Sequence, residues 1–246
     1  MNGAERIEAV AYRAIAAASG AFVQDVRGGV CLASPHVPAT EVNRVVGVEA
    51  DLDLDAVEEF YARAGVRVVV PVPPGLDALE HELEGRRYAR GYPWVKFERE
   101  AERAPTADST LRIEETNDAD AYGRTVAEGF GAPPESSGAF GGVVGLPGWH
   151  CFVAWDGNDP AAGAALLVDG GAAWLGAAST RPAFRRRGAQ NALLAARIER
   201  AVELGAQLLT VETGAPAGGR PGGSYRNILR AGFRESYVRP NWLAPA

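Results

Sequence analysis

The stretch RPAFRRRGAQNALLAARIERA, residues 181–201, joins three consecutive arginines and a glycine to the start of an amphipathic helix. Leu194 and Ile198 recur at the spacing of one helix face, and we expect Arg197 to lie outside that face. The run AAWLGAAST (172–180), directly before this stretch, is typical of a strand. A strand, a glycine-containing loop and a helix that packs on the sheet therefore follow one another, which favours a layered α/β fold.

The start of this helix has the properties of an anion site. The first turn of a helix leaves backbone N–H groups unpaired and carries the positive end of the helix dipole. Gly188 permits close approach to the backbone, and successive amides suit a diphosphate. The side chains of Arg185, Arg186 and Arg187 are further donors to phosphate oxygens. The alternative is a solvated basic helix start, but the position between a strand and a core helix favours a phosphate site.

The composition limits the classes of function. A chain of 246 residues has room for one large domain or two smaller ones, and its net charge of −6 argues against a nucleic-acid binder. Cys31 and Cys151 lie far apart without metal-ligand spacing, so we expect no metal site. No apolar run approaches about 18 residues and the N-terminus lacks the pattern of a secretion signal. We therefore expect a cytoplasmic protein that does not enter a membrane.

The chain divides at EREAERAPTADST (98–110), which lacks apolar periodicity, and we interpret residues 99–109 as a linker. Residues 1–98 alternate between helix and strand patterns, and residues 110–246 contain three sequential strands with turn residues between them, followed by the helix after Gly188. The sequence therefore predicts an α/β (α+β) fold with a mixed, mostly antiparallel sheet flanked by helices. The expected helices of the first part are 5–18, 53–65 and 75–91, and its strands are 21–26, 29–34, 43–49, 66–72 and 94–99; the second part has strands at 111–115, 149–157, 161–170, 172–180, 207–213 and 233–242, helices at 118–130 and 224–232, and a helix or ordered loop at 133–144.

The loop pattern resembles that of one known family. The P-loop and the Gly-x-Gly-x-x-Gly patterns are absent, whereas Arg185-x-x-Gly188-x-Gln190 closely resembles the pyrophosphate loop of the GNAT acetyltransferases, Gln/Arg-x-x-Gly-x-Gly/Ala. The resemblance covers residues 110–243 and implies a GNAT-type N-acetyltransferase that uses acetyl-coenzyme A as cosubstrate. It implies that the backbone of Ala178, Ser179 and Thr180 holds the pantetheine arm, and that Arg185, Arg186, Arg187, Gly188, Ala189 and Gln190 hold the diphosphate.

The chain departs from the family pattern after the loop. Gln190 stands where Gly or Ala is usual, which implies a small change at the end of the loop and no loss of the site. Ile228 occupies the position of the usual tyrosine general acid, and Pro221 that of the usual asparagine. Tyr225, one turn before Ile228, is a substitute only if the helix is shifted.

Acyl transfer to an amine also needs a proton acceptor. Glu212, at the end of the strand 207–213, is the first candidate for the general base, and a carboxylate paired with an arginine is an equally good interpretation. His150 is a weaker candidate, because a lone histidine is more often structural. For an acceptor pocket the candidates are Glu128, Phe130 and Trp149, with solvated or core positions as the alternative, and the same alternative holds for Tyr237 and Trp242.

The first part repeats the strand–helix–strand–helix–strand order of the second without an arginine–glycine loop. Its EADLDLDAVEEF segment (49–60) places carboxylates where a phosphate would bind. We therefore predict a tandem arrangement, with a degenerate GNAT-like domain at 1–98 and an acetyltransferase domain at 110–246; an independent cap domain is the simpler alternative.

Two classes of function remain from the sequence. The first is direct acetyl transfer from acetyl-coenzyme A to a small-molecule or N-terminal amine in a ternary complex. The second is a non-catalytic acyl-coenzyme A binding or sensing protein, for which Ile228 is the argument. A homodimer is compatible with the sequence, and neither nucleic acid nor a membrane is an expected partner.

Overall fold

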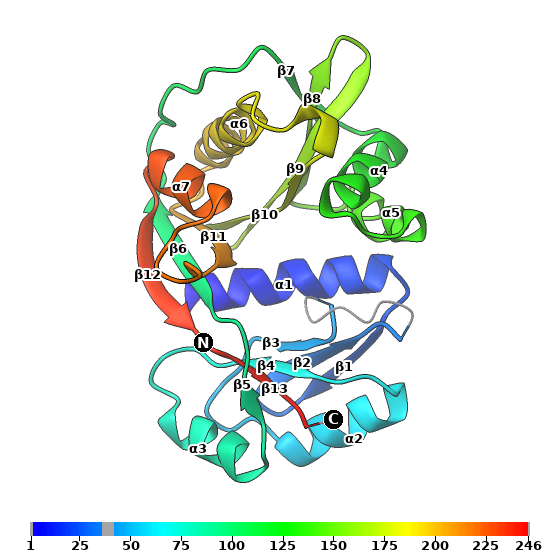
Figure 1. Cartoon of the computed structure of the whole chain (residues 1–246), viewed down its shortest axis with the longest axis vertical. Helices are drawn as coiled ribbons and strands as arrows, with labels where there is room; N and C mark the ends of the chain where they lie inside the picture. Colours follow the sequence, from blue (N-terminus) through cyan, green and yellow to red (C-terminus); the bar gives the residue numbers. More distant parts are fainter. Residues whose placement is uncertain (1, 36–41, 246) are drawn as a thin grey trace.

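The computed structural model describes residues 2–35 and 42–245 and contains two sheets with one helix between them (Figure 1). This helix, α1 (Gly3–Ala18), contacts strands of both sheets. The first sheet has the order β1-β2-β3-β4-β13-β5, and the second has the order β12-β6-β11-β10-β9-β8-β7. Asn2 caps α1 by accepting a hydrogen bond from the N–H of Glu5.

The first sheet is covered on its outer side by two helices (Figure 1). The side chain of Asp53 caps the first of them, and Gly65 ends it in the left-handed conformation. The apolar faces of both helices pack into one core with the sheet. The elements are β1 (Phe22–Val26), β2 (Gly29–Ala33), β3 (Arg44–Val46), α2 (Leu54–Ala64), β4 (Val69–Pro71), α3 (Asp77–Gly85), β5 (Ala89–Arg90) and β13 (Asn241–Leu243).

The second sheet is mixed and mostly antiparallel, with helices on both faces, which confirms the predicted fold class. Helices α4 and α5 lie on the same face as α1, and helices α6 and α7 cover the other (Figure 1). The elements are β6 (Trp94–Glu100), β7 (Arg112–Thr116), α4 (Ala119–Phe130), a 3₁₀ turn (Pro134–Ser136), α5 (Ser137–Gly141), β8 (Trp149–Asp156), β9 (Asp159–Asp169), β10 (Ala172–Thr180), a 3₁₀ turn (Pro182–Phe184), α6 (Ala189–Glu203), β11 (Leu208–Gly214), α7 (Gly223–Arg230) and β12 (Arg234–Arg239).

The two sheets exchange strands, which the sequence prediction did not anticipate. β6, predicted to complete the first part, pairs with β11 and β12 of the second sheet. The strand predicted over 233–242 is two strands, and β13 pairs with β4 and β5 of the first sheet. Pro240, which separates β12 from β13, lacks an N–H for strand pairing. The division into units at 98 and 110 stays a prediction, but neither sheet is built from one side of that division alone.

Two local predictions also need correction. The helix expected over 75–91 ends at Gly85, and residues 89–90 form the short strand β5. Arg197, expected outside the apolar face of α6, is 1% exposed. Its guanidinium donates to the carbonyls of Leu193, Ala165 and Gly176, so the side chain has polar partners inside the core.

Candidate active site

The central feature of the second sheet is a separation between β10 and β11, which we call the strand parting. These parallel strands pair only where Ala172–Trp174 meets Leu208–Thr210, and in the described residues no further pairing joins them. β10 continues to Thr180 and β11 to Gly214. A bulge in β10 between Gly176 and Ser179, with Ala177 at a φ of 44°, accompanies the parting. The edge of β10 that faces away from β9 is thereby left open to an extended ligand.

The loop after β10 leads from the parting into α6. Arg186 has a φ of 65° and Gly188 a φ of 79°, so the chain turns sharply before the helix. A Cβ at Gly188 would lie 2.3 Å from the carbonyl oxygen of Asp108, so space as well as φ requires glycine here. No side chain caps the first turn of α6 within the described chain. Its N–H groups are therefore available to an external anion, and the loop fits a diphosphate.

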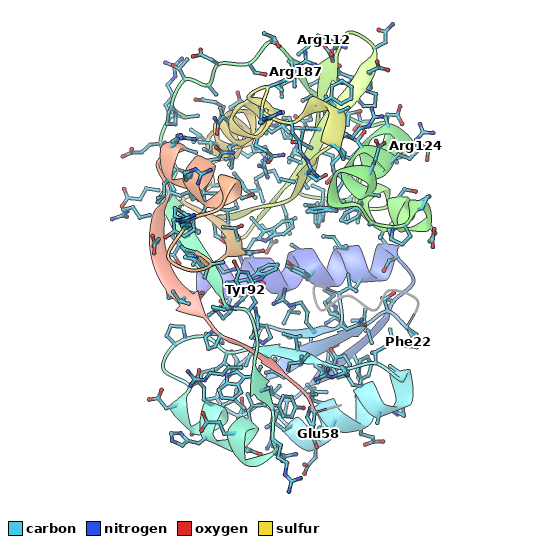
Figure 2. The ribbon with its side chains drawn as sticks, in the orientation of Figure 1. Phe22, Glu58, Tyr92, Arg112, Arg124 and Arg187 are labelled. Carbon is cyan, nitrogen blue, oxygen red and sulfur yellow. The ribbon has the colours of Figure 1, made fainter. Side chains whose placement is uncertain are left out.

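The three arginines of the loop have different surroundings. Arg187 forms a bidentate ion pair with Asp156 at 2.6 and 2.9 Å, and this hydrogen bond lowers the pKa of the Asp156 carboxyl. Arg185 donates to the carbonyls of Thr180, at 3.3 Å, and Gly129, at 3.2 Å. Arg186 is exposed and forms no hydrogen bond or ion pair with the described residues. Two of the arginines therefore brace the loop, and Arg186 is the one that is free for a ligand. Figure 2 shows Arg187 beside the start of α6.

Side chains fix the end of β10 to its neighbouring helices. Gln190 Nε2 donates to Thr180 Oγ1 at 2.9 Å, which joins the first turn of α6 to the strand. Ser179 Oγ donates to the carbonyl of Val126 on α4 at 2.9 Å. A Cβ at Gly129 would lie 2.3 Å from Ser179 Oγ, so α4 and β10 pack closely. Gln190, the unusual residue of the loop, thus holds the strand end in place.

Glu212 lies on β11, two residues beyond the last residue paired with β10. Its side chain is 5% exposed. Oε1 accepts a hydrogen bond from Trp174 Nε1 at 3.0 Å, and Oε2 pairs with Lys96 Nζ at 2.8 Å. The carboxylate is therefore beside the parting, and its role as a general base stays a prediction. Its ion-pair partner is a lysine of β6 rather than the arginine considered as the alternative.

The two weaker catalytic candidates lie elsewhere. His150 Nδ1 is 2.6 Å from Glu115 Oε1 on β7. His150 lies on β8, and the whole of β9 separates it from β10 in the sheet. Tyr225 donates its hydroxyl proton to Glu235 on the edge strand β12, and this hydrogen bond raises the pKa of Tyr225 to about 12. Neither side chain faces the strand parting.

The predicted pocket residues do not form one wall. Phe130 is 54% exposed and stacks on Phe140, with ring centroids 5.7 Å apart. Trp149 is a buried core residue that meets Trp174 edge to face. Glu128 forms an ion pair with Arg181 at 2.8 Å. Tyr237 and Trp242 do not line an acceptor pocket either. Tyr237 donates a hydrogen bond to Glu5 of α1, and Trp242 lies in the core of the first sheet.

Sequence reasoning missed the residues that surround Glu212. Lys96 bridges Glu212 and Glu8, and Arg239 pairs with both Glu5 and Glu8. All of these side chains are at most 5% exposed. The available signal was weak: Lys96 is the single lysine of the chain, and Glu5 and Glu8 lie one turn apart on the first helix.

Within residues 2–35 and 42–245, no group of three or more His, Cys, Asp or Glu side chains is placed to hold a metal ion. In the same residues, no helix has the length and apolarity that a membrane span requires.

Comparisons with known proteins agree with this geometry. A family model described as an acetyltransferase (GNAT) domain matches residues 83–217, more than half of the 246-residue chain. A comparison with curated protein sequences found no match. Among solved structures, a GCN5-related N-acetyltransferase from Kribbella flavida is similar over 100% of this chain and 97% of that chain, with a TM-score of 0.68 and 15% sequence identity.

Two other solved structures share the fold. A GCN5-related N-acetyltransferase from Sphaerobacter thermophilus has a TM-score of 0.67 and 15% identity, with 89% of this chain and 81% of that chain covered. A tandem GNAT protein from the clavulanic acid biosynthesis pathway has a TM-score of 0.60 and 14% identity, with 89% and 79% covered. Together with the family match, the strand parting and its glycine loop lead to one conclusion: the chain belongs to the GNAT acetyltransferase domain family and is an acetyltransferase.

Proposed function

We propose that the protein transfers the acetyl group of acetyl-coenzyme A to an amine, on a small molecule or at a peptide N-terminus, by direct transfer in a ternary complex. The observation that carries this proposal is the parting of β10 and β11, which opens directly into the Gly188 loop. The open edge of residues 178–180 pairs with the pantetheine arm, and the uncapped first turn of α6 receives the diphosphate.

Some residues of the loop contact the ligand, and others keep the loop in its conformation. The amides around Gly188, Ala189 and Gln190 face the diphosphate, and Arg186 adds its free guanidinium. Arg185 and Arg187 keep the loop in shape through Thr180 and Asp156. Binding energy at this loop fixes the reacting group in the parting, where proximity and orientation contribute to the rate.

The acceptor nitrogen must lose a proton during transfer. Bound acetyl-coenzyme A supplies a thioester: a C–N bond forms to the acceptor nitrogen, the C–S bond breaks, and the leaving sulfur becomes a thiol when it takes up a proton. Glu212 accepts the proton of the amine, because it is the carboxylate beside the parting. Lys96 has a second carboxylate partner, Glu8, so its charge stays balanced when Glu212 becomes protonated.

The test is thiol release from acetyl-coenzyme A with a panel of amines, for the wild type and Glu212→Gln. Loss of the general base is expected to lower kcat by about 10²- to 10⁴-fold. The Kd for acetyl-coenzyme A should stay within about threefold of the wild-type value, because the loop is untouched. The matched control is Glu115→Gln, which removes a carboxylate on the edge strand β7 and should leave kcat within about twofold, because β8 and β9 separate β7 from β10.

Two results would contradict the proposal. Wild-type protein that binds acetyl-coenzyme A but releases no thiol with any primary amine would indicate a binding or sensing protein. Equal kcat for the wild type and Glu212→Gln would remove Glu212 as the proton acceptor.

A further inference from the structure

A buried cluster of charges joins the first helix of the chain to the strand parting. Glu5 and Glu8 come from α1, Lys96 from β6 and Arg239 from the end of β12. Lys96 is 1%, Glu8 2% and Glu212 5% exposed. Buried charges need partners in good geometry, so the positions of these groups depend on one another.

Lys96 is the central member of this cluster. Its Nζ donates to Glu8 Oε2 on α1 and, at 2.8 Å, to Glu212 Oε2 on β11. Glu8 is also held by both terminal nitrogens of Arg239, at 2.6 and 2.7 Å. Lys96 is therefore clamped between one carboxylate fixed by Arg239 and one carboxylate beside the parting.

A second chain of contacts leads from α1 to Glu212. The ring of Tyr12 meets Trp174 edge to face, with ring centroids 5.9 Å apart. Trp174 Nε1 donates to Glu212 Oε1. The two oxygens of Glu212 are thus oriented from two directions, and α1 lies behind both.

The use of lysine at this position has a physical reason. The chain has 25 lysine and arginine residues, and Lys96 is the single lysine. A compact ammonium with three donors fits between two carboxylates on different elements, whereas the planar guanidinium of arginine requires a wider, forked site. The position therefore calls for a point charge between Glu8 and Glu212.

We propose that Glu8 and Lys96 are positioning residues of the acetyltransferase site, through which α1 sets the orientation and the charged surroundings of Glu212. This inference rests on the proposed role of Glu212 as proton acceptor. It assigns the N-terminal helix, which lies outside the residues of the family match, a part in the reaction of the second sheet.

The charge states of the cluster support this role. Burial lowers the pKa of Lys96, but the negative charges of Glu212 and Glu8 together raise it by more. The net direction is therefore upward, and the ammonium persists at neutral pH. Burial raises the pKa of Glu8, but the positive charges of Arg239 and Lys96 together lower it by more, so Glu8 stays ionised. Besides its own members Glu5 and Arg239, this cluster faces Tyr12 of α1, Arg44 of β3 and Tyr237 of β12.

The test uses two substitutions with opposite expected effects on the acid limb of the kcat/KM profile. In Glu8→Gln, the negative charge that shares Lys96 with Glu212 is removed. Lys96 then stabilises ionised Glu212 more strongly, so the acid limb moves to lower pH by about one unit. In Lys96→Met, ionised Glu212 loses its cation, so the limb moves to higher pH by a similar amount. The KM for acetyl-coenzyme A should change by less than about twofold in both variants, and the control Glu115→Gln should leave the limb in place.

A spectroscopic measurement separates this inference from the proposed function. The indole N–H resonance of Trp174, assigned by its loss or shift in Glu212→Gln, reports the protonation of Glu212 without acetyl-coenzyme A. If the wild type releases no thiol but this resonance titrates with opposite shifts in Glu8→Gln and Lys96→Met, the proposed function fails and the positioning stands. If thiol is released but neither the limb nor the resonance moves, or both variants move them in the same direction, the positioning is overturned. Thermal unfolding is measured first, and if Lys96→Met does not fold, the sign of the shift in Glu8→Gln decides alone.

Discussion

At the residue scale, Arg197 shows how one buried cation supports the ligand-binding strand. Its guanidinium donates to the carbonyls of Ala165, at 3.0 Å, and Gly176, at 3.3 Å, where the bulge interrupts the pairing of β9 and β10. Burial lowers the pKa of Arg197 to about 10, which the nearby Tyr122 partly opposes. The side chain is nevertheless protonated at neutral pH, and it donates to buried carbonyls on both strands next to the bulge.

Replacement of Arg197 by methionine is expected to destabilise the protein. The variant keeps the apolar stem but leaves buried carbonyls unpaired, at a cost of about 1–3 kcal/mol in the free energy of unfolding. For a chain of 246 residues that corresponds to a fall in Tm of roughly 2–12 °C. Thermal unfolding followed by circular dichroism measures it.

Arg200→Met on the same helix is the control. Arg200 is 34% exposed and pairs with Glu203, so its loss should change the free energy of unfolding by less than about 1 kcal/mol. An Arg197→Met protein as stable as the wild type would show that the charge burial costs as much as the carbonyl contacts contribute.

At the element scale, the sequence is informative wherever local chemistry decides. Asp53 and Gly65 mark the ends of α2, and the Gly188 loop begins α6 as predicted. The burial of Arg197 could not be predicted, because amphipathic spacing does not reveal acceptor carbonyls on strands that are distant in the sequence. The partners of Glu212 were missed for a similar reason: they come from α1, β6 and β10, which are far apart in the sequence.

Strand order is likewise outside the reach of local pattern. The strand predicted at 94–99 is confirmed as β6, and part of the strand predicted over 233–242 is β12, but the pairing of β6 with β12 is a long-range contact. The alternation of apolar and polar residues along a strand indicates which side chains share a face, but it does not identify the strands that pair with it. The boundary placed before residue 99 therefore separated β6 from the sheet to which it belongs.

At the scale of the whole molecule, the exchanged strands tie the two sheets together. β13 from the end of the chain lies between β4 and β5, and β6 lies between β11 and β12 (Figure 1). Trp242 of β13 is 1% exposed in the core of the first sheet, and Asn241 Nδ2 donates to the carbonyl of Tyr92 just before β6. Loss of packing in one sheet should therefore destabilise the other sheet as well.

Trp242→Ala tests this coupling. Removal of a buried tryptophan side chain is expected to cost about 3–5 kcal/mol. Because the strands are exchanged, the variant should still unfold in one transition, and acetyl-coenzyme A binding at the second sheet should be lost over the same temperature range. Phe22→Ala, on the edge strand of the same sheet with 55% of the residue exposed, is the control and should shift Tm by only a few degrees. Two separate transitions in Trp242→Ala, with binding retained through the first, would show independent units.

The most direct measurement is isothermal titration of acetyl-coenzyme A into the wild type, Arg186→Glu and Arg124→Glu. Arg186 is the free guanidinium of the Gly188 loop. Arg124, labelled on α4 in Figure 2, is an exposed arginine that forms no hydrogen bond or ion pair with the described residues. We expect micromolar binding to the wild type, about tenfold weaker binding to Arg186→Glu, which corresponds to about 1.4 kcal/mol, and wild-type binding to Arg124→Glu. Absence of binding to the folded wild type, or equal affinity for all three proteins, would contradict a diphosphate site at this loop.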